Sequence, residues 1–335
     1  MEPKAKTAYF EWLRIFASAA VVLMHTAATQ WSGISHTLPQ WQVLTWWDSL
    51  VRWPVPIFIM ITGALFLPRK TPLRKMLGSY IPRMAACYLI WSAVYALYNR
   101  NLTVQTLVSG HYHLWYLPYL CGVYLVLPFL QKIAEDDQLT DRLLACCLVI
   151  GTGFPWLVKL VSFLWPEQSG LMSALANLVN YTFFFDQMGL LLLGHKLHRT
   201  ELRPAVRRTI YALGILGICV TGAATIWATD RSGVQSSLFF DFAAPNNLLA
   251  AVALFVFAKY HLNTLPKFAA LAARCSFGIY LTHVLVIDFL ADRGYHVLTW
   301  NPVWSVPVLA AAVFAISFAL TALLKKLPVV GKYVV

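Results

Sequence analysis

The stretch from Tyr9 to Thr29 constrains the fold of this chain most, because it is an apolar segment with ionisable side chains inside it. Its length fits a membrane-spanning helix, yet Glu11, Arg14, Ser18 and His25 lie within it. At about 100° per residue, Arg14 and His25 differ by only about 20° around the helix axis and lie roughly 16 Å apart along it. Ionisable groups are costly in hydrocarbon and mark a functional site by default. We therefore expect one face of this helix to form the wall of an active site.

The composition favours a membrane protein for the whole chain. Of the 335 residues, 59% are hydrophobic and 12% are charged, and the mean hydropathy is +0.63. Apolar runs at this density are typical of polytopic membrane proteins and not of soluble domains. The first run contains Glu11 and Arg14 and is not followed by a small-residue cleavage site, so we expect a retained span and not a signal peptide. The connections are short, which predicts one membrane domain over residues 1–335.

The apolar runs predict an all-α polytopic membrane protein with about ten transmembrane helices. The expected ranges are 9–29, 44–67, 80–98, 114–132, 142–160, 177–197, 208–228, 242–261, 274–291 and 303–324. Lys and Arg gather in the termini and in the connections on their side, while the opposite connections carry only Arg100, Lys159, Arg231 and Arg293. By the positive-inside rule, both termini are expected to be cytoplasmic. The same rule explains the net charge of +12 without a nucleic-acid partner.

The second expected helix contains a charged pair and a break. Asp48 and Arg52 are four residues apart on one face, where they can form an ion pair. Pro54 and Pro56 follow and remove two backbone donors, so we expect the helix to break near its outer end. Such breaks are tolerated where the backbone lines a cavity.

Two later helices also carry polar groups. Asp186 lies near the middle of the sixth expected helix and needs a partner such as Arg14 or Arg52. The ninth helix has a second polar stripe at spacings of 4 and 3, formed by Ser276, Tyr280 and His283. A single histidine on a helix face is more often structural than catalytic. Two such stripes, in helices at opposite ends of the chain, favour a shared polar cavity.

The loops add candidates on both sides of the membrane. The connection from Arg69 to Arg83 is the densest cation cluster, and topology determination explains most such loops. Arg83, however, begins an apolar run, which places it at the membrane surface, where it could hold a ligand with several phosphates. On the outer side, His111 and His113 precede Trp115 at the entrance to the fourth helix. Interfacial anchoring is the favoured interpretation for His111.

The chemistry of these groups limits the function classes. The sequence contains no Walker A loop and no HExxH, GxSxG or GxGxxG motif, so ATP-driven transport and zinc hydrolysis have no support and no metal site is expected. A histidine in a cavity of low dielectric constant stays neutral near pH 7 and is suited to general-base work. Arginines are suited to phosphates or to a developing oxyanion.

Four segments resemble the membrane acyltransferase 3 family, which contains bacterial O-acyltransferases of surface glycans. EWLRIFASAAVVLMH resembles the first-helix motif of the family, an Arg and a His with ten residues between them. RWPVPIFIMITGALF resembles an arginine followed by V-P-x-F-F-x-x-S-G, with Ile59 and Thr62 as departures. HLWYLPYLCGVYLVLP resembles H-x-W-F-L, and SFGIYLTHVLVI resembles S-x-x-I-Y-L-x-H. The four occur in order from the first helix to the ninth, as in the short stand-alone members.

The resemblance implies an acyl-CoA donor, usually acetyl-CoA, bound from the cytoplasm as co-substrate. It also implies a hydroxyl acceptor on an outward-facing glycan or cell-envelope precursor, and a location in the bacterial cytoplasmic membrane. Carried over by position, His25 is the catalytic histidine, acting as a base or as a transient acyl carrier beside Arg14. Arg14, Arg74 and Arg83 would contact the donor. The residues that would line or position the site are Arg52, His113, Trp115, Tyr280, His283 and Asp186.

Two other functions are compatible with the same set of polar and charged residues. A proton-coupled transporter would use His25, Asp186 and Arg14 as a relay, although only the second helix has a predicted break and transporters often contain paired broken helices. A donor-binding membrane sensor or partner subunit would bind acetyl-CoA without turnover. A homo-oligomer is compatible with each of the three.

Overall fold

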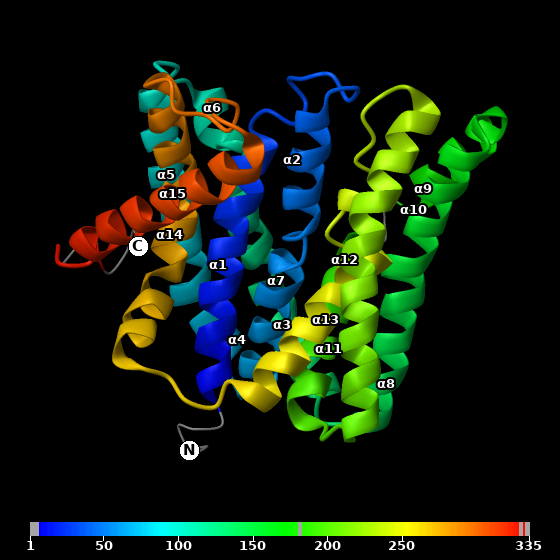
Figure 1. Cartoon of the computed structure of the whole chain (residues 1–335). Coiled ribbons are helices and arrows are strands. Elements are labelled where there is room, and N and C mark those ends of the chain that lie inside the picture. The colour runs from blue at the N-terminus through cyan, green and yellow to red at the C-terminus, as the bar shows by residue number, and fades with distance from the viewer. Residues whose placement is uncertain (1–6, 180–182, 328–330, 332–335) are drawn as a thin grey trace.

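The structure is a computed structural model, and it describes residues 7–179, 183–327 and 331 as an assembly of helices (Figure 1). The described ranges contain no strand, so the all-α fold is confirmed. The longer α-helices are α1 (Ala8–Ala28), α2 (Pro39–Ser49), α3 (Pro54–Phe66), α5 (Ile81–Tyr98), α7 (Tyr116–Ile133), α8 (Asp137–Cys146), α9 (Phe154–Leu164), α10 (Ser169–Val179), α11 (Phe183–Arg199), α12 (Pro204–Ser232), α13 (Pro245–His261), α14 (Lys267–Asp292) and α15 (Pro302–Leu324). The shorter elements are α4 (Leu73–Lys75), η2 (Met76–Tyr80), α6 (Val104–Ser109), η3 (Tyr112–Trp115), η4 (Cys147–Gly153), η5 (Pro166–Gln168) and η7 (Leu238–Phe240).

The helices match the expected ranges and are compatible with a multi-pass protein. Each of the ten expected ranges contains helix, although residues 180–182 of the sixth lie outside the described part. Within that part, eight helical segments are long and apolar enough to cross a membrane. Met76–Tyr98 and α11 are helical but are not among the eight. The number of ten spans and the cytoplasmic termini therefore stay predictions.

The break expected near the two prolines is confirmed, and it divides the second span into α2 and α3. Helix α2 ends at Ser49 and α3 begins at Pro54. Proline at the first helical position lacks an N–H that would have no partner there in any case, so it favours a new helix start. The same rule explains why α2 begins at Pro39, earlier than the expected 44. The short connection between the two helices carries Arg52.

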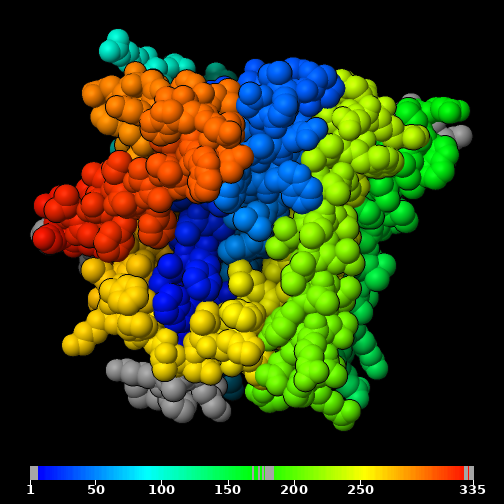
Figure 2. All heavy atoms as spheres, viewed as in Figure 1, coloured from blue at the N-terminus to red at the C-terminus, as the bar shows by residue number. Residues whose placement is uncertain are grey.

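Helix α1 lies at the centre of the molecule. It packs against α2, α3, α13, α14 and α15, and α15 crosses it at a large angle (Figure 1). Figure 2 shows only a narrow strip of α1 between α15, α2 and the chain around α13 and α14. Phe10 and Leu13 are buried in a core shared with α3, α7, α11 and α13. The apolar face of α1 is therefore anchored, and its polar face borders other elements.

Helices α3 and α11 approach each other closely enough to require glycine. A Cβ atom on Gly63 would lie 1.9 Å from the carbonyl oxygen of Leu191, and one on Gly194 would lie 2.1 Å from that of Met60. Small residues permit such close backbone contact between membrane helices. Gly63 therefore serves the packing of α3 against α11.

We expect Gly63→Ala to destabilise the protein, because the new methyl group would overlap the backbone carbonyl of Leu191 in α11. The expected loss is about 1–3 kcal/mol, measured as a lower unfolding midpoint in detergent. Gly78→Ala is the matched control, because a Cβ atom at Gly78 would have no neighbour within 4 Å. Equal midpoints for the two variants would contradict the assigned contact.

Candidate active site

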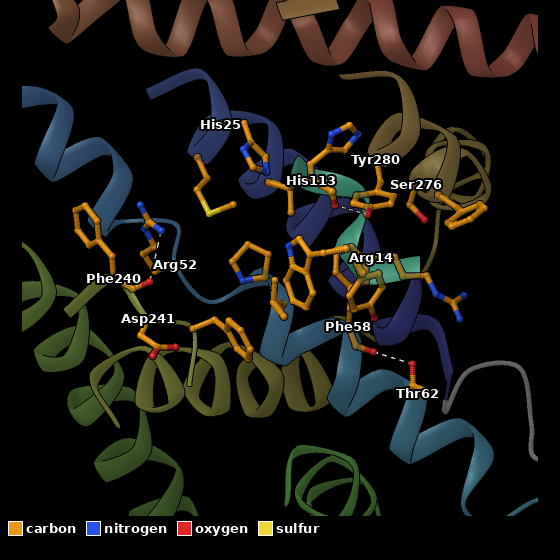
Figure 3. Close-up of a pocket in the computed structure, with 18 of the residues that line it drawn as sticks. Arg14, His25, Arg52, Phe58, Thr62, His113, Phe240, Asp241, Ser276 and Tyr280 are labelled. Carbon is orange, nitrogen blue, oxygen red and sulfur yellow. Dashed lines mark hydrogen bonds between the residues drawn. The ribbon is translucent and has the colours of Figure 1, made fainter. Parts of the chain in front are cut away.

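A cavity of about 510 Å³ lies beside the polar face of α1. Its walls come from α1, the connection before α3, α3 itself, η3, α7, α14, the end of η7 and the segment that follows it (Figure 3). The volume is in the usual range for small-molecule sites. The expected site residues that line this cavity are Arg14, His25, Arg52, His113, Trp115 and Tyr280.

Helix α1 places one charged residue and one imidazole along the cavity. Arg14 and His25 both line it, so the cavity follows about three turns of the helix. The Arg14 guanidinium is 2.6 Å from a carboxylate oxygen of Glu11, and its side chain is 31% exposed. Ser18 shares the sequence stripe but has a local role, because its buried hydroxyl donates to the Arg14 carbonyl at 2.7 Å.

Three histidines from different elements meet at one end of the cavity. The ring centroids of His25 and His283 are 5.1 Å apart, those of His113 and His283 are 5.2 Å apart, and those of His25 and His113 are 6.4 Å apart. Figure 3 shows His25, His113 and Tyr280 gathered together there. The two polar stripes expected from the sequence therefore face each other. In the described chain, no group of three or more His, Cys, Asp or Glu side chains could hold a metal ion.

Backbone carbonyls orient this histidine cluster. His283 Nδ1 is 2.7 Å from the carbonyl oxygen of Tyr280. A carbonyl only accepts, so Nδ1 carries the hydrogen and Nε2 of the neutral ring is left as an acceptor. That Nε2 is buried without a partner. The Tyr280 hydroxyl in turn donates to the carbonyl of His113 at 2.6 Å, which ties α14 to η3.

Tyr95 supports the turn of α14 that carries His283, and the sequence pattern did not predict this role. Its buried hydroxyl donates to the carbonyl of Leu281 at 2.9 Å and accepts from the amide of Leu285 at 3.0 Å. These are the two groups that would bond each other in a regular α-helix, so the hydroxyl bridges them. A single tyrosine in an apolar helix has no periodic signal that could have identified it.

His111 belongs to the same region, which the anchoring interpretation did not foresee. Its ring stacks on Tyr95 with centroids 4.4 Å apart, and its Nδ1 is 3.1 Å from Nδ1 of His113. Burial lowers the pKa of His111 below its ordinary value. The neutral ring is thereby favoured, and it can share one hydrogen with His113.

The ion pair expected between Asp48 and Arg52 is confirmed. Asp48 is fully buried, and its carboxylate accepts from the Arg52 guanidinium. The guanidinium also lies over the ring of Phe240, 4.0 Å from the centroid, and donates to the carbonyl of Phe240 at 3.4 Å. These contacts hold a cation at the cavity wall.

The end of η7 and the residues after it also form part of the wall, and the sequence pattern did not predict this. Phe240, Asp241 and Phe242 line the cavity, and the ring of Phe242 stacks on Trp115 with centroids 5.7 Å apart. Asn247 holds this segment by donating to the carbonyl of Asp241 at 2.7 Å. The paired asparagines at the start of α13 are a signal that could have drawn attention to it.

The other expected residues lie elsewhere. Asp186 is buried but is not among the described residues that line the cavity, and its Oδ1 has no partner. Its expected pairing with Arg14 or Arg52 is wrong, because each arginine pairs with a carboxylate on its own or the adjoining helix. Arg74 and Arg83 are exposed and do not line the cavity.

Removing the buried carboxylate should destabilise the protein strongly. Asp48→Asn would leave the Arg52 charge without its counter-ion, and we expect a loss on the order of 3 kcal/mol. The matched control is Glu135→Gln, which removes a surface carboxylate that lies 3.3 Å from Lys132. Its effect on the free energy of unfolding should stay within about 1 kcal/mol. Unfolding midpoints in detergent measure both, and an unchanged midpoint for Asp48→Asn would show that the pair is not structural.

Comparisons with known proteins identify the family of this chain. A family model described as an acyltransferase domain matches residues 7–322, nearly the whole chain. No curated protein and no solved structure gives a match. The matched region includes the cavity and seven of the eight segments that could cross a membrane, and it covers the eighth, Pro302–Leu324, as far as residue 322. The chain therefore belongs to the membrane acyltransferase 3 family and is a multi-pass membrane acyltransferase.

Proposed function

We propose that this protein is an O-acyltransferase that moves an acetyl group from cytoplasmic acetyl-CoA to a hydroxyl of an extracytoplasmic glycan or cell-envelope precursor. The reaction would take place in the bacterial cytoplasmic membrane. The observation that carries the proposal is that Arg14 and His25, about three turns apart on α1, line one cavity. A cavity of this length could admit a donor at one end and an acceptor at the other.

His25 is the proposed base. Its ring takes the hydrogen of the acceptor hydroxyl while the acceptor oxygen forms a bond to the thioester carbonyl carbon. The carbon–sulfur bond then breaks, the sulfur leaves with the electron pair, and the imidazolium returns the proton to it. The products are free CoA and the acetyl ester. His283 and His113 contact the His25 ring and position it.

Arg14 suits the donor end. It lies roughly 16 Å along the helix from His25, which is too far for contact with an oxyanion that forms beside the imidazole. A guanidinium that is partly exposed can bind phosphate or hold the donor chain in place. Arg83 and Arg74, on the side where the donor would enter, are expected to attract its phosphates before it reaches the cavity.

The aromatic end suits the acceptor. Trp115 and Phe242 form a stacked pair at the cavity wall, on the side that the charge distribution assigns to the outside. Flat aromatic surfaces offer apolar contact to the C–H faces of sugar rings, while Asp241 beside them offers a hydrogen-bond acceptor.

The transporter alternative has less support. Its relay requires Asp186 together with His25 and Arg14, and the cavity wall includes the last two but not Asp186 among the described residues. A binding subunit without turnover is distinguished by product formation, so the experiments below measure labelled product and not donor binding alone.

We expect His25→Ala to lower the initial rate of acetyl transfer by about 10²–10⁴-fold, because the base that accepts the hydroxyl hydrogen is lost. The measurement uses purified protein, radiolabelled acetyl-CoA and candidate lipid-linked glycans, with labelled product as the readout. His261→Ala is the matched control, since His261 is exposed at the end of α13 and outside the cavity. Transfer by His25→Ala at the control rate would refute the assigned base.

We expect Phe242→Ala to raise the KM for the acceptor about three- to tenfold and to leave the KM for acetyl-CoA unchanged, because one half of the stacked pair is removed. Phe268→Ala, at an exposed position outside the cavity, is the control. If the KM for acetyl-CoA rose instead, the donor and acceptor ends would be reversed.

A further inference from the structure

The cavity beside α1 contains two cationic side chains with different surroundings. Arg14 and Arg52 are the only arginine or lysine residues among the described residues that line it. Arg14 lies roughly 16 Å along α1 from His25 and pairs with Glu11 at 2.6 Å. Arg52 comes from the connection between α2 and α3, and its charge is close enough to act on the His25 ring. Arg52 is therefore the cation at the histidine end of the cavity.

Three contacts fix the Arg52 guanidinium in place. The fully buried Asp48 carboxylate accepts from one terminal nitrogen, and the Phe240 carbonyl accepts from the other at 3.4 Å. The Phe240 ring covers one face of the guanidinium, with the central carbon 4.0 Å from the ring centroid. Figure 3 shows Arg52 beside Phe240 at the cavity wall. Because the contacts come from two segments far apart in the sequence, the cation has little freedom to turn away.

The guanidinium keeps hydrogen-bond donors for a ligand. Of its five N–H groups, two are used by Asp48 and Phe240, and the Nε–H is buried without a partner. Within the described contacts, one N–H on each terminal nitrogen is left, and the side chain is 20% exposed at the cavity wall. Arg52 can therefore donate to an oxygen atom inside the cavity and keep its present contacts.

Stability alone does not explain this arrangement. Burying an ion pair is costly, and replacing such a pair by apolar side chains is often neutral or stabilising. The chain also interrupts a helix where it carries Arg52, since α2 ends at Ser49 and α3 begins at Pro54. A cation held in an apolar wall is suited to negative charge that develops during a reaction, because it needs no reorganisation when that charge appears.

We propose that Arg52 is a further catalytic residue, which stabilises the oxyanion formed from the thioester carbonyl during acyl transfer. The inference rests on the acyl transfer proposed above. When the acceptor oxygen bonds to the carbonyl carbon, His25 takes the hydroxyl hydrogen and the carbonyl π electrons move to the carbonyl oxygen. That oxygen accepts from the remaining N–H groups of Arg52. The electron pair then re-forms the carbonyl, the carbon–sulfur bond breaks, and the sulfur leaves with its electrons and receives the proton.

The test compares acetyl-CoA with its dithioester analogue, in which sulfur replaces the carbonyl oxygen. Sulfur accepts weaker hydrogen bonds than oxygen, so the ratio of the two kcat values reports a donor at that atom. Arg52→Lys keeps a charge beside Asp48 but loses the planar fork. Arg14→Lys is the contrast at the donor end. Arg293→Lys is the matched control, because Arg293 is exposed, lies over the ring of Phe289 and is outside the cavity.

We expect Arg52→Lys to lower kcat with acetyl-CoA about 10²-fold or more and to keep the KM for acetyl-CoA within about twofold. The ratio of kcat for the oxygen donor over the sulfur donor should fall about tenfold or more in this variant. It should not change in Arg14→Lys or Arg293→Lys, because neither side chain meets the reacting oxygen. An unchanged kcat or an unchanged ratio in Arg52→Lys overturns the inference, and so does a fall in the ratio of Arg14→Lys.

A second variant separates catalysis from folding. Asp48→Asn/Arg52→Gln removes both charges together, so no unpaired charge stays buried. Its unfolding midpoint in detergent should stay close to that of the unchanged protein, while its kcat ratio falls as in Arg52→Lys. If this variant folds and keeps the ratio of the unchanged protein, Arg52 is not the oxyanion donor. Product with equal ratios would refute only this role of Arg52, whereas the absence of acetylated product from the unchanged protein would refute the acyl transfer itself.

Discussion

The cost of placing charge in an apolar interior governs the organisation of this protein. A buried carboxylate or guanidinium is stabilised by a counter-charge close by, and a carboxyl group without one is tolerated by binding a proton. Asp48 and Arg52 satisfy that condition across the break between α2 and α3, and Glu11 and Arg14 satisfy it within one turn of α1. Each arginine is thereby fixed at the cavity wall while part of its surface stays available for a ligand.

The histidines are held by a different means. Their neighbours are mainly backbone carbonyls and other rings, so their orientation depends on how α14 and η3 are positioned. Tyr280 joins these two elements, and Tyr95 bridges the backbone of α14 near His283. Such contacts orient a ring without adding a charge beside it, which suits an imidazole that must accept a hydrogen.

Helical periodicity explains both what could be predicted and what could not. Spacing within one helix predicted the polar face of α1, the pairing of Asp48 with Arg52 and the stripe that carries His283. Proline chemistry predicted the break before α3. Contacts between helices have no such signal, so Tyr95 was missed and Asp186 was assigned the wrong partners. The segment at Phe242 is irregular, and its place at the cavity follows only from how α12 and α13 pack.

We propose that the acyl donor enters the cavity beside α1 and presents its carbonyl to His25. An experimental structure of the protein with a non-hydrolysable acetyl-CoA analogue would test this placement. We expect density for the acyl group next to the imidazole of His25, with the rest of the donor extending past Arg14. Density for the acyl group outside this cavity, or beside Asp186, would contradict it.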